Sequence, residues 1–224
     1  MVFQVKIKMT DNTRIYISKA GSTSAYVDLL QMLTGAGLIL FMYSHMVLVA
    51  SVNLGPETMN AIARFFENTY MAQVGGPIIG IIFLFHFVLA ARKIPFKTNE
   101  VSIFWKHSML LRHIDTWLWM IQVFTAMIIL IMGSIHIWTI LTDLPISAAK
   151  SASHIRSGYW LVFDLILLLM VEVHTGIGFY RIAVKWGFIK RRGRIPFAVI
   201  VVILTAIFIS IGLITIVNFL RLPL

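Results

Sequence analysis

The sequence predicts an all-α membrane protein: a bundle of five transmembrane helices with the N-terminus in the cytoplasm and the C-terminus in the periplasm. Hydrophobic residues make up 59% of the 224 residues, and the mean hydropathy is +0.88. A soluble domain contains far less apolar surface than this. Five stretches are apolar over at least the ~20 residues that a helix needs to cross a hydrocarbon core of ~30 Å. The basic residues gather on one side of these stretches.

Residues 1–26 precede the first apolar stretch and form a cytoplasmic N-terminal arm. Apolar and polar residues alternate over residues 2–10 and 13–20, on either side of Asp11 and Asn12. Such alternation is typical of strands, so the arm is predicted to be a β-hairpin.

Residues 27–220 are predicted to form one transmembrane domain. The spans within it are residues 27–50, 68–91, 116–142, 157–180 and 195–220. Only the fourth span holds carboxylates well inside its length, at Asp164 and Glu172. The connection over residues 92–115 is basic, contains Trp105, and is long enough for a helical arm or an interfacial helix at the cytoplasmic surface.

The distribution of Lys and Arg sets the expected orientation. All but four of the 19 basic residues fall in the N-terminal arm, in the connection 92–115 or in residues 181–194. Cytoplasmic loops carry the excess of Lys and Arg, so these three segments are expected in the cytoplasm. The net charge of +10 follows from this topology and requires no nucleic-acid partner.

Four histidines lie inside four of the five spans, and their depths match in pairs. At 1.5 Å per residue, His45 and His136 lie roughly 27 and 30 Å from the cytoplasmic ends of their spans, and His86 and His174 roughly 8 to 9 Å. A histidine in a bilayer is costly, so two matched pairs predict two haem irons, each held between imidazoles of different helices. The chain has no cysteine, which excludes covalent c-type attachment and leaves haem b.

Other roles for these histidines stay open at this point. A single transmembrane histidine can serve in an interhelical hydrogen bond, a haem-free transporter can carry polar groups in its spans, and a structural anchor needs no haem. His107, His113 and His154 lie in connections, where a solvated or hydrogen-bonded histidine is expected.

Several strings around these histidines resemble a known family. They are GLILFMYSHM, HFVLAARKIP, LLRHIDTWLWMIQ, MGSIHIW and VEVHTGIGFYRIAVKWG, within residues 27–190. They are similar to the dihaem cytochrome b membrane-anchor subunit of bacterial quinol:fumarate reductases and related succinate:quinone oxidoreductases. The resemblance implies that His45 and His136 hold an outer haem and that His86 and His174 hold an inner one, the pairing that the depths give independently.

The resemblance also implies roles for other residues. Glu67 would accept a proton from menaquinol near the outer haem, although spacing alone favours an ordinary interfacial glutamate. Glu172 lies two residues before His174, hence about 200° away around the helix, and would relay protons through the membrane unless it only hydrogen-bonds between helices. The donors to the haem propionates would be Gln31, Trp119 and Lys185, the last of which could instead reach lipid phosphates.

The expected function is that of a membrane anchor in an oxidoreductase complex of the bacterial inner membrane. Menaquinol would be oxidised near the outer haem, and electrons would pass through two haem b groups to an iron–sulfur subunit facing residues 92–115. A flavoprotein subunit would hold the dicarboxylate site, and the heterotrimers can pair as dimers. The alternatives are a dihaem anchor of a hydrogenase, formate dehydrogenase or nitrate reductase, or a haem-free transporter.

Overall fold

The computed structural model describes residues 11–94, 98–111 and 113–223, and within these ranges it is built from helices without any strand. Five helices are long and apolar enough to cross a membrane, as predicted. They are α1 (Asp11–Ala50), α3 (Gly76–Ala91) together with the π-helical turn Met71–Gly75 that precedes it, α5 (Ile114–Thr142), α7 (Trp160–Lys185) and α8 (Arg194–Arg221).

The N-terminal arm differs from the prediction where the structure describes it. Residues 13–20 belong to α1, so the second expected strand is wrong; residues 2–10 lie outside the described residues. A two-stranded hairpin is marginal on its own. Continuing α1 satisfies the backbone groups of this segment locally, without a partner strand.

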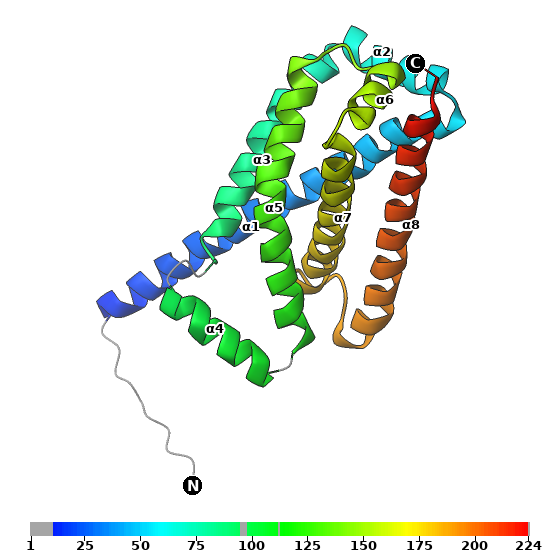
Figure 1. Cartoon of the computed structure of the whole chain (residues 1–224). Helices are drawn as coiled ribbons and strands as arrows, with labels where there is room; N and C mark the ends of the chain where they lie inside the picture. Colours follow the sequence, from blue (N-terminus) through cyan, green and yellow to red (C-terminus); the bar gives the residue numbers. More distant parts are fainter. Residues whose placement is uncertain (1–10, 95–97, 112, 224) are drawn as a thin grey trace.

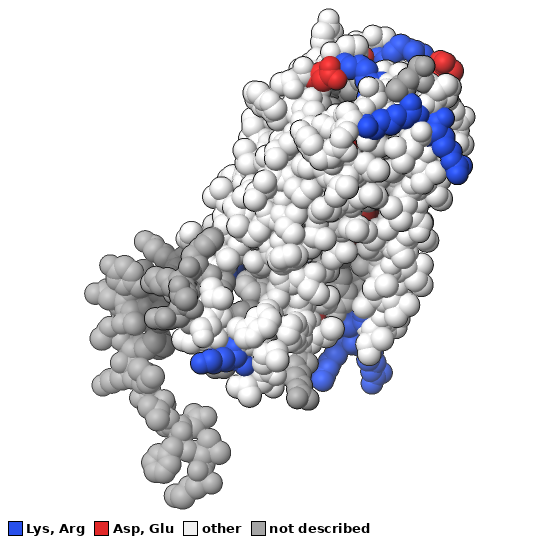
Figure 2. All heavy atoms as spheres, viewed as in Figure 1, with Lys and Arg blue, Asp and Glu red and all other residues white. Residues whose placement is uncertain are grey.

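Short helices cap the bundle at its two ends (Figure 1). Helices α2 (Pro56–Asn68) and α6 (Ala148–Arg156) lie at one end together with the C-terminus, which we call the α2–α6 end. Helix α4 (Thr98–Leu111) and the turn between α7 and α8 lie at the other, the α4 end. Charged side chains gather at both ends, and the surface between them is almost wholly uncharged on the face that Figure 2 shows. This belt suits a bilayer; which end faces the cytoplasm stays a prediction.

Packing of the long helices depends on small residues. Helix α5 packs mainly against α7, α7 against α8, and α1 against α3. A Cβ atom at Gly176 would collide with the Thr205 hydroxyl, and one at Gly212 would lie 2.7 Å from Leu168. These two glycines therefore set how closely α7 and α8 approach.

The α2–α6 end holds the main cluster of fully buried apolar side chains. Pro56 opens α2 after Gly55, whose φ of 121° favours glycine. Ser147 caps α6 by accepting a hydrogen bond from the backbone of Lys150 at 3.2 Å. The cluster between these helices consists of Val52, Met59, Ala148, Ala152, Ile155 and Phe219. Val49 of α1, Leu161 of α7 and Ile216 of α8 pack against it, so it holds the short helices over the ends of these three long ones.

Candidate functional site

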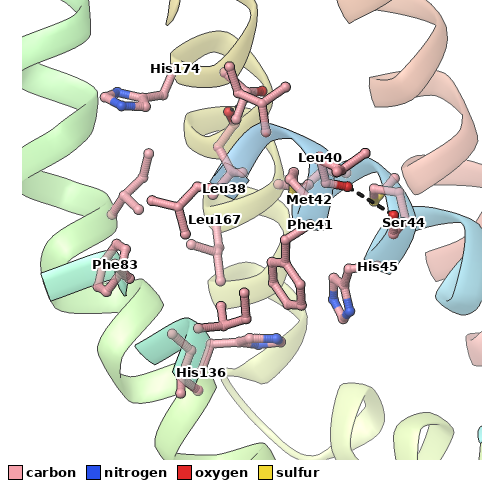
Figure 3. A pocket seen from close by; sticks show the side chains of 18 of the residues that line it. Leu38, Leu40, Phe41, Met42, Ser44, His45, Phe83, His136, Leu167 and His174 are labelled. Atoms are coloured by element: carbon pink, nitrogen blue, oxygen red, sulfur yellow. Dashed lines mark hydrogen bonds between the residues drawn. The ribbon is translucent and has the colours of Figure 1, made fainter. Parts of the chain in front are cut away.

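One cavity of about 1100 Å³ runs between the long helices, and all four transmembrane histidines line it. Figure 3 shows three of them: His45, His136 and His174. His45 and His136 stand toward the α2–α6 end, and His86 and His174 toward the α4 end. Pockets for one small ligand usually measure about 300–1,000 Å³. This cavity is thus large enough for more than one group.

The histidines nearer the α2–α6 end approach each other across the cavity. The ring of His45, from α1, and the ring of His136, from α5, have centroids 6.1 Å apart and planes inclined at 75°. An iron atom bonded to two opposed imidazole nitrogens at about 2 Å each would place the ring centroids about 6 Å apart. The spacing of this pair therefore fits a bis-histidine haem. Phe41 stacks on the His45 ring at 5.8 Å.

A side chain of α1 forms a hydrogen bond with one ring nitrogen of His86 and so orients the ring. Its Nδ1 lies 2.9 Å from the Thr34 hydroxyl oxygen, which already donates its own hydrogen to the Leu30 carbonyl at 2.8 Å. When the hydroxyl donates to this carbonyl, it accepts from Nδ1–H, and the lone pair of Nε2 is then free. A Cβ at Gly35 would lie 2.9 Å from the His86 ring, so a glycine is needed for the ring to rest against α1.

The ring of His174 is held in the same way from α5. Its Nδ1 lies 3.1 Å from the Gln122 carbonyl oxygen and 3.1 Å from the Thr125 hydroxyl. A carbonyl oxygen only accepts, so Nδ1 carries the hydrogen and Nε2 keeps its lone pair. Metal-binding histidines commonly have their second nitrogen fixed like this by a hydrogen-bond acceptor. The donor set at both ends of the cavity thus fits haem iron.

Cations surround one carboxylate at the α4 end of the cavity. Asp28 of α1 forms ion pairs with Arg92, with Lys93 at 2.8 Å and with Lys185 at 2.6 Å. Arg181, two turns beyond His174, also lines the cavity and donates a hydrogen bond to the side-chain oxygen of Gln122. Positive charge exceeds negative charge here, which suits anionic propionates.

The crowding of these cations changes the chemistry of Lys93. Burial and the neighbouring charges of Lys185 and Arg92 lower the pKa of Lys93 from 10.5 to about 8. This ammonium group can therefore lose its proton under mildly alkaline conditions.

The three expected propionate donors all line the cavity. Gln31 and Lys185 lie near its α4 end, and Trp119 joins them from α5. The side-chain oxygen of Gln31 is buried and accepts no hydrogen bond from a described residue. Lys185 is engaged with Asp28. All three are placed to reach a group inside the cavity.

Glu67 lies at the end of α2, outside the lining of the cavity. Its Oε1 accepts a hydrogen bond from the backbone nitrogen of Ile146, just before α6. The neighbouring Phe66 does line the cavity, so Glu67 borders the His45/His136 end without facing into it. The carboxylate joins α2 to the segment that begins α6.

Glu172 points away from the cavity, in keeping with its angular offset from His174. Its side chain is 0% exposed, and neither carboxylate oxygen accepts a hydrogen bond from a described residue. Tyr43 of α1 is its polar neighbour. A buried carboxylate without hydrogen bonds is costly and is often functional in a membrane protein.

Sequence reasoning missed the groups that hold the histidines. Thr34 and Thr125 lie on neighbouring spans at the depths of His86 and His174. This match in depth could have predicted both hydrogen bonds from the sequence. Asp28, which gathers three basic side chains, gave no signal because its partners are distant in sequence.

These features define a helical membrane protein whose interior cavity is lined by four histidines from four helices. The sequence profile of the succinate dehydrogenase/fumarate reductase transmembrane subunit family matches residues 98–211. A fumarate reductase cytochrome b subunit of Helicobacter pylori is 38% identical over 183 residues, which are 77% of this chain and 71% of that protein. The fumarate reductase cytochrome b subunit of Wolinella succinogenes is 34% identical over 178 residues, 75% of this chain and 70% of that protein. The chain belongs to this family, and the resemblance seen in its sequence is confirmed.

Proposed function

We propose that the chain is the cytochrome b membrane anchor of a quinol:fumarate reductase or succinate dehydrogenase complex, with one haem b at each histidine pair. The names of the relatives support this assignment. The observation that carries it is the arrangement of four histidines from four helices in two pairs along one cavity. The proposed location is the bacterial inner membrane, with the α4 end in the cytoplasm.

The side chains of the cavity would hold the two haems and keep water from them. His45, His136, His86 and His174 would bind the haem irons, while Lys185, Gln31 and Trp119 would bind propionates. When bound, two haem b groups supply one-electron redox chemistry that connects menaquinol at the α2–α6 end with the soluble partners at the α4 end.

Protons released at the α2–α6 end need an acceptor, and Glu67 is our proposal for it. The hydrogen bond from Ile146 to Oε1 orients this carboxylate, and Oε2 stays available for the proton. Glu172 would take up and release a proton within the bundle. Proton transfer along with the electrons would offset the electrical work of about 2.3 kcal/mol per charge for each 100 mV.

The α4 end is proposed to meet an iron–sulfur subunit, which passes electrons to a flavoprotein subunit that holds the dicarboxylate site. Helix α4 exposes a set of apolar side chains there: Val101, Ile103, Trp105, Met109 and Leu110. Trp105 also contacts Trp117 of α5 edge to face at 6.0 Å, which ties α4 to the bundle. Two such heterotrimers can associate as a dimer.

A haem assay on the purified complex tests the proposal. The pyridine haemochrome of the parent should give two haem b per subunit, and His174→Ala and His136→Ala should each give one. His113→Asn is the matched control, because His113 lies in a connection and asparagine can keep its role as the N-cap of α5. A parent without haem would overturn the proposal in favour of a transporter or a bare anchor. Co-purification of a hydrogenase, formate dehydrogenase or nitrate reductase subunit would instead identify another dihaem complex.

A further inference from the structure

A carboxylate near the α2–α6 end of the bundle lies close to one of the proposed iron ligands. Asp164 lies in the second turn of α7 and lines the cavity. Its Oδ1 is 4.0 Å from Nδ1 of His136, and its side chain is only 18% exposed. The pairing joins α7 to α5 at the end of the cavity where His45 and His136 meet.

The two histidine pairs differ in what lies next to Nδ1. His86 and His174 have neutral partners there, namely hydroxyl and carbonyl oxygens. His136 has a carboxylate instead. Among the described residues, no Lys or Arg forms an ion pair with Asp164. Asp143 differs, because Lys150 pairs with it and neutralises its charge.

The separation of 4.0 Å defines the kind of interaction. It is longer than a direct hydrogen bond, so it acts through charge. Coulomb attraction falls only as the inverse of distance and is strong where the effective dielectric constant is low. A carboxylate at this distance favours the tautomer of His136 with the hydrogen on Nδ1, which leaves Nε2 free on the opposite side of the ring.

We propose that Asp164 is a positioning residue for the haem held by His45 and His136, and that its charge lowers the midpoint potential of that haem. The proposal rests on the proposed haem function. A carboxylate partner makes an imidazole ligand more basic, and a nearby negative charge stabilises ferric iron more than ferrous iron. The haem at His86 and His174 lacks this partner, so the two haems are expected to differ in potential.

Redox titration of the intact complex, followed by haem absorbance, tests this role. Asp164→Asn keeps the size and removes the charge, so the potential of the His45/His136 haem should become more positive while that of the other haem stays constant. Asp164→Glu restores the charge and should move the potential back toward the parent value. Asp143→Asn is the matched control: it removes a carboxylate from the same end of the cavity, where Lys150 is its partner at 2.8 Å. His136→Ala shows which of the two potentials belongs to which haem.

The outcomes separate this proposal from the one on which it rests. Two haems and unchanged potentials in Asp164→Asn would overturn the role of Asp164 and leave the haem assignment intact. Selective loss of the His45/His136 haem in Asp164→Asn, with recovery in Asp164→Glu, would support positioning. An equal positive shift in Asp143→Asn would also contradict it, because the effect would then be general to negative charge at that end. A parent complex without haem would refute the proposed function itself.

Discussion

At the scale of single residues, the ability of a histidine to bind a metal depends on which of its two ring nitrogens already forms a hydrogen bond. The imidazoles of His86 and His174 would be ambiguous as ligands if both nitrogens were free. The acceptors Thr34 and Gln122 resolve the ambiguity, since each binds the Nδ1 side of a ring. Nε2 is then the only nitrogen with a lone pair, and the hydrogen bond at Nδ1 fixes the orientation of the ring without any bound ligand.

Lys93 gives a prediction about pH. Its folded-state pKa of about 8 lies below its ordinary value, so it changes from cation to neutral amine as the pH rises through this region. Any support that it gives to a haem propionate is present at pH 7 and is lost as the pH rises above 8. A bound propionate anion would keep the ammonium group of Lys93 protonated to a somewhat higher pH. Haem retained after gel filtration should therefore fall between about pH 8 and 10.

Lys93→Arg is the control for this prediction. A guanidinium group stays protonated throughout this range, so the variant should keep its haem where the parent loses it. Equal loss from both proteins, measured by the Soret absorbance, would show that the charge of Lys93 is not the cause.

At the scale of helices, two glycines in one turn of α7 have different roles. Gly178 lines the cavity, whereas Gly176 faces α8 and lies against Thr205. Gly133 also serves packing, because its Cβ would lie 3.5 Å from Phe83 of α3. Small residues near a histidine therefore do not by themselves indicate a haem.

The contact of Gly176 with Thr205 can be tested by a double-mutant cycle. Gly176→Ala should destabilise the bundle by about 1–3 kcal/mol, because the added methyl group overpacks the α7–α8 interface. Thr205→Ala removes the hydroxyl that the new Cβ would meet, so the double variant should regain most of the loss. Unfolding in mixed detergent micelles measures all four proteins. Additive losses in the double variant would exclude this contact as the cause.

The five spans and the matched depths of the histidines could be predicted from the sequence because both follow from local patterns. Apolar length identified the five spans, and depth along each span paired His45 with His136 and His86 with His174. The arm at residues 13–20 misled because alternation favours a strand only where another strand can pair with it. Asp28 and Asp164 became informative only in three dimensions, because their partners lie on other helices.

At the scale of the whole molecule, the distribution of basic residues predicts that the α4 end faces the cytoplasm. The chain has no cysteine, so single cysteines can be introduced without a background. Arg192 at the α4 end and Asn68 at the α2–α6 end are both exposed. In intact spheroplasts an impermeant maleimide should label Asn68→Cys and not Arg192→Cys, and in inverted vesicles the reverse. Labelling of Arg192→Cys in spheroplasts would reverse the topology that the positive-inside rule predicts.

The ion pairs of Asp28 have a mechanical consequence for the molecule. Helix α1 contributes the carboxylate, the end of α3 leads into Arg92 and Lys93, and the last turn of α7 contributes Lys185. One carboxylate thus links the ends of three helices that are far apart in sequence. An anion arriving there competes for all three cations at once, so the ends of α1, α3 and α7 would respond to it together rather than one by one.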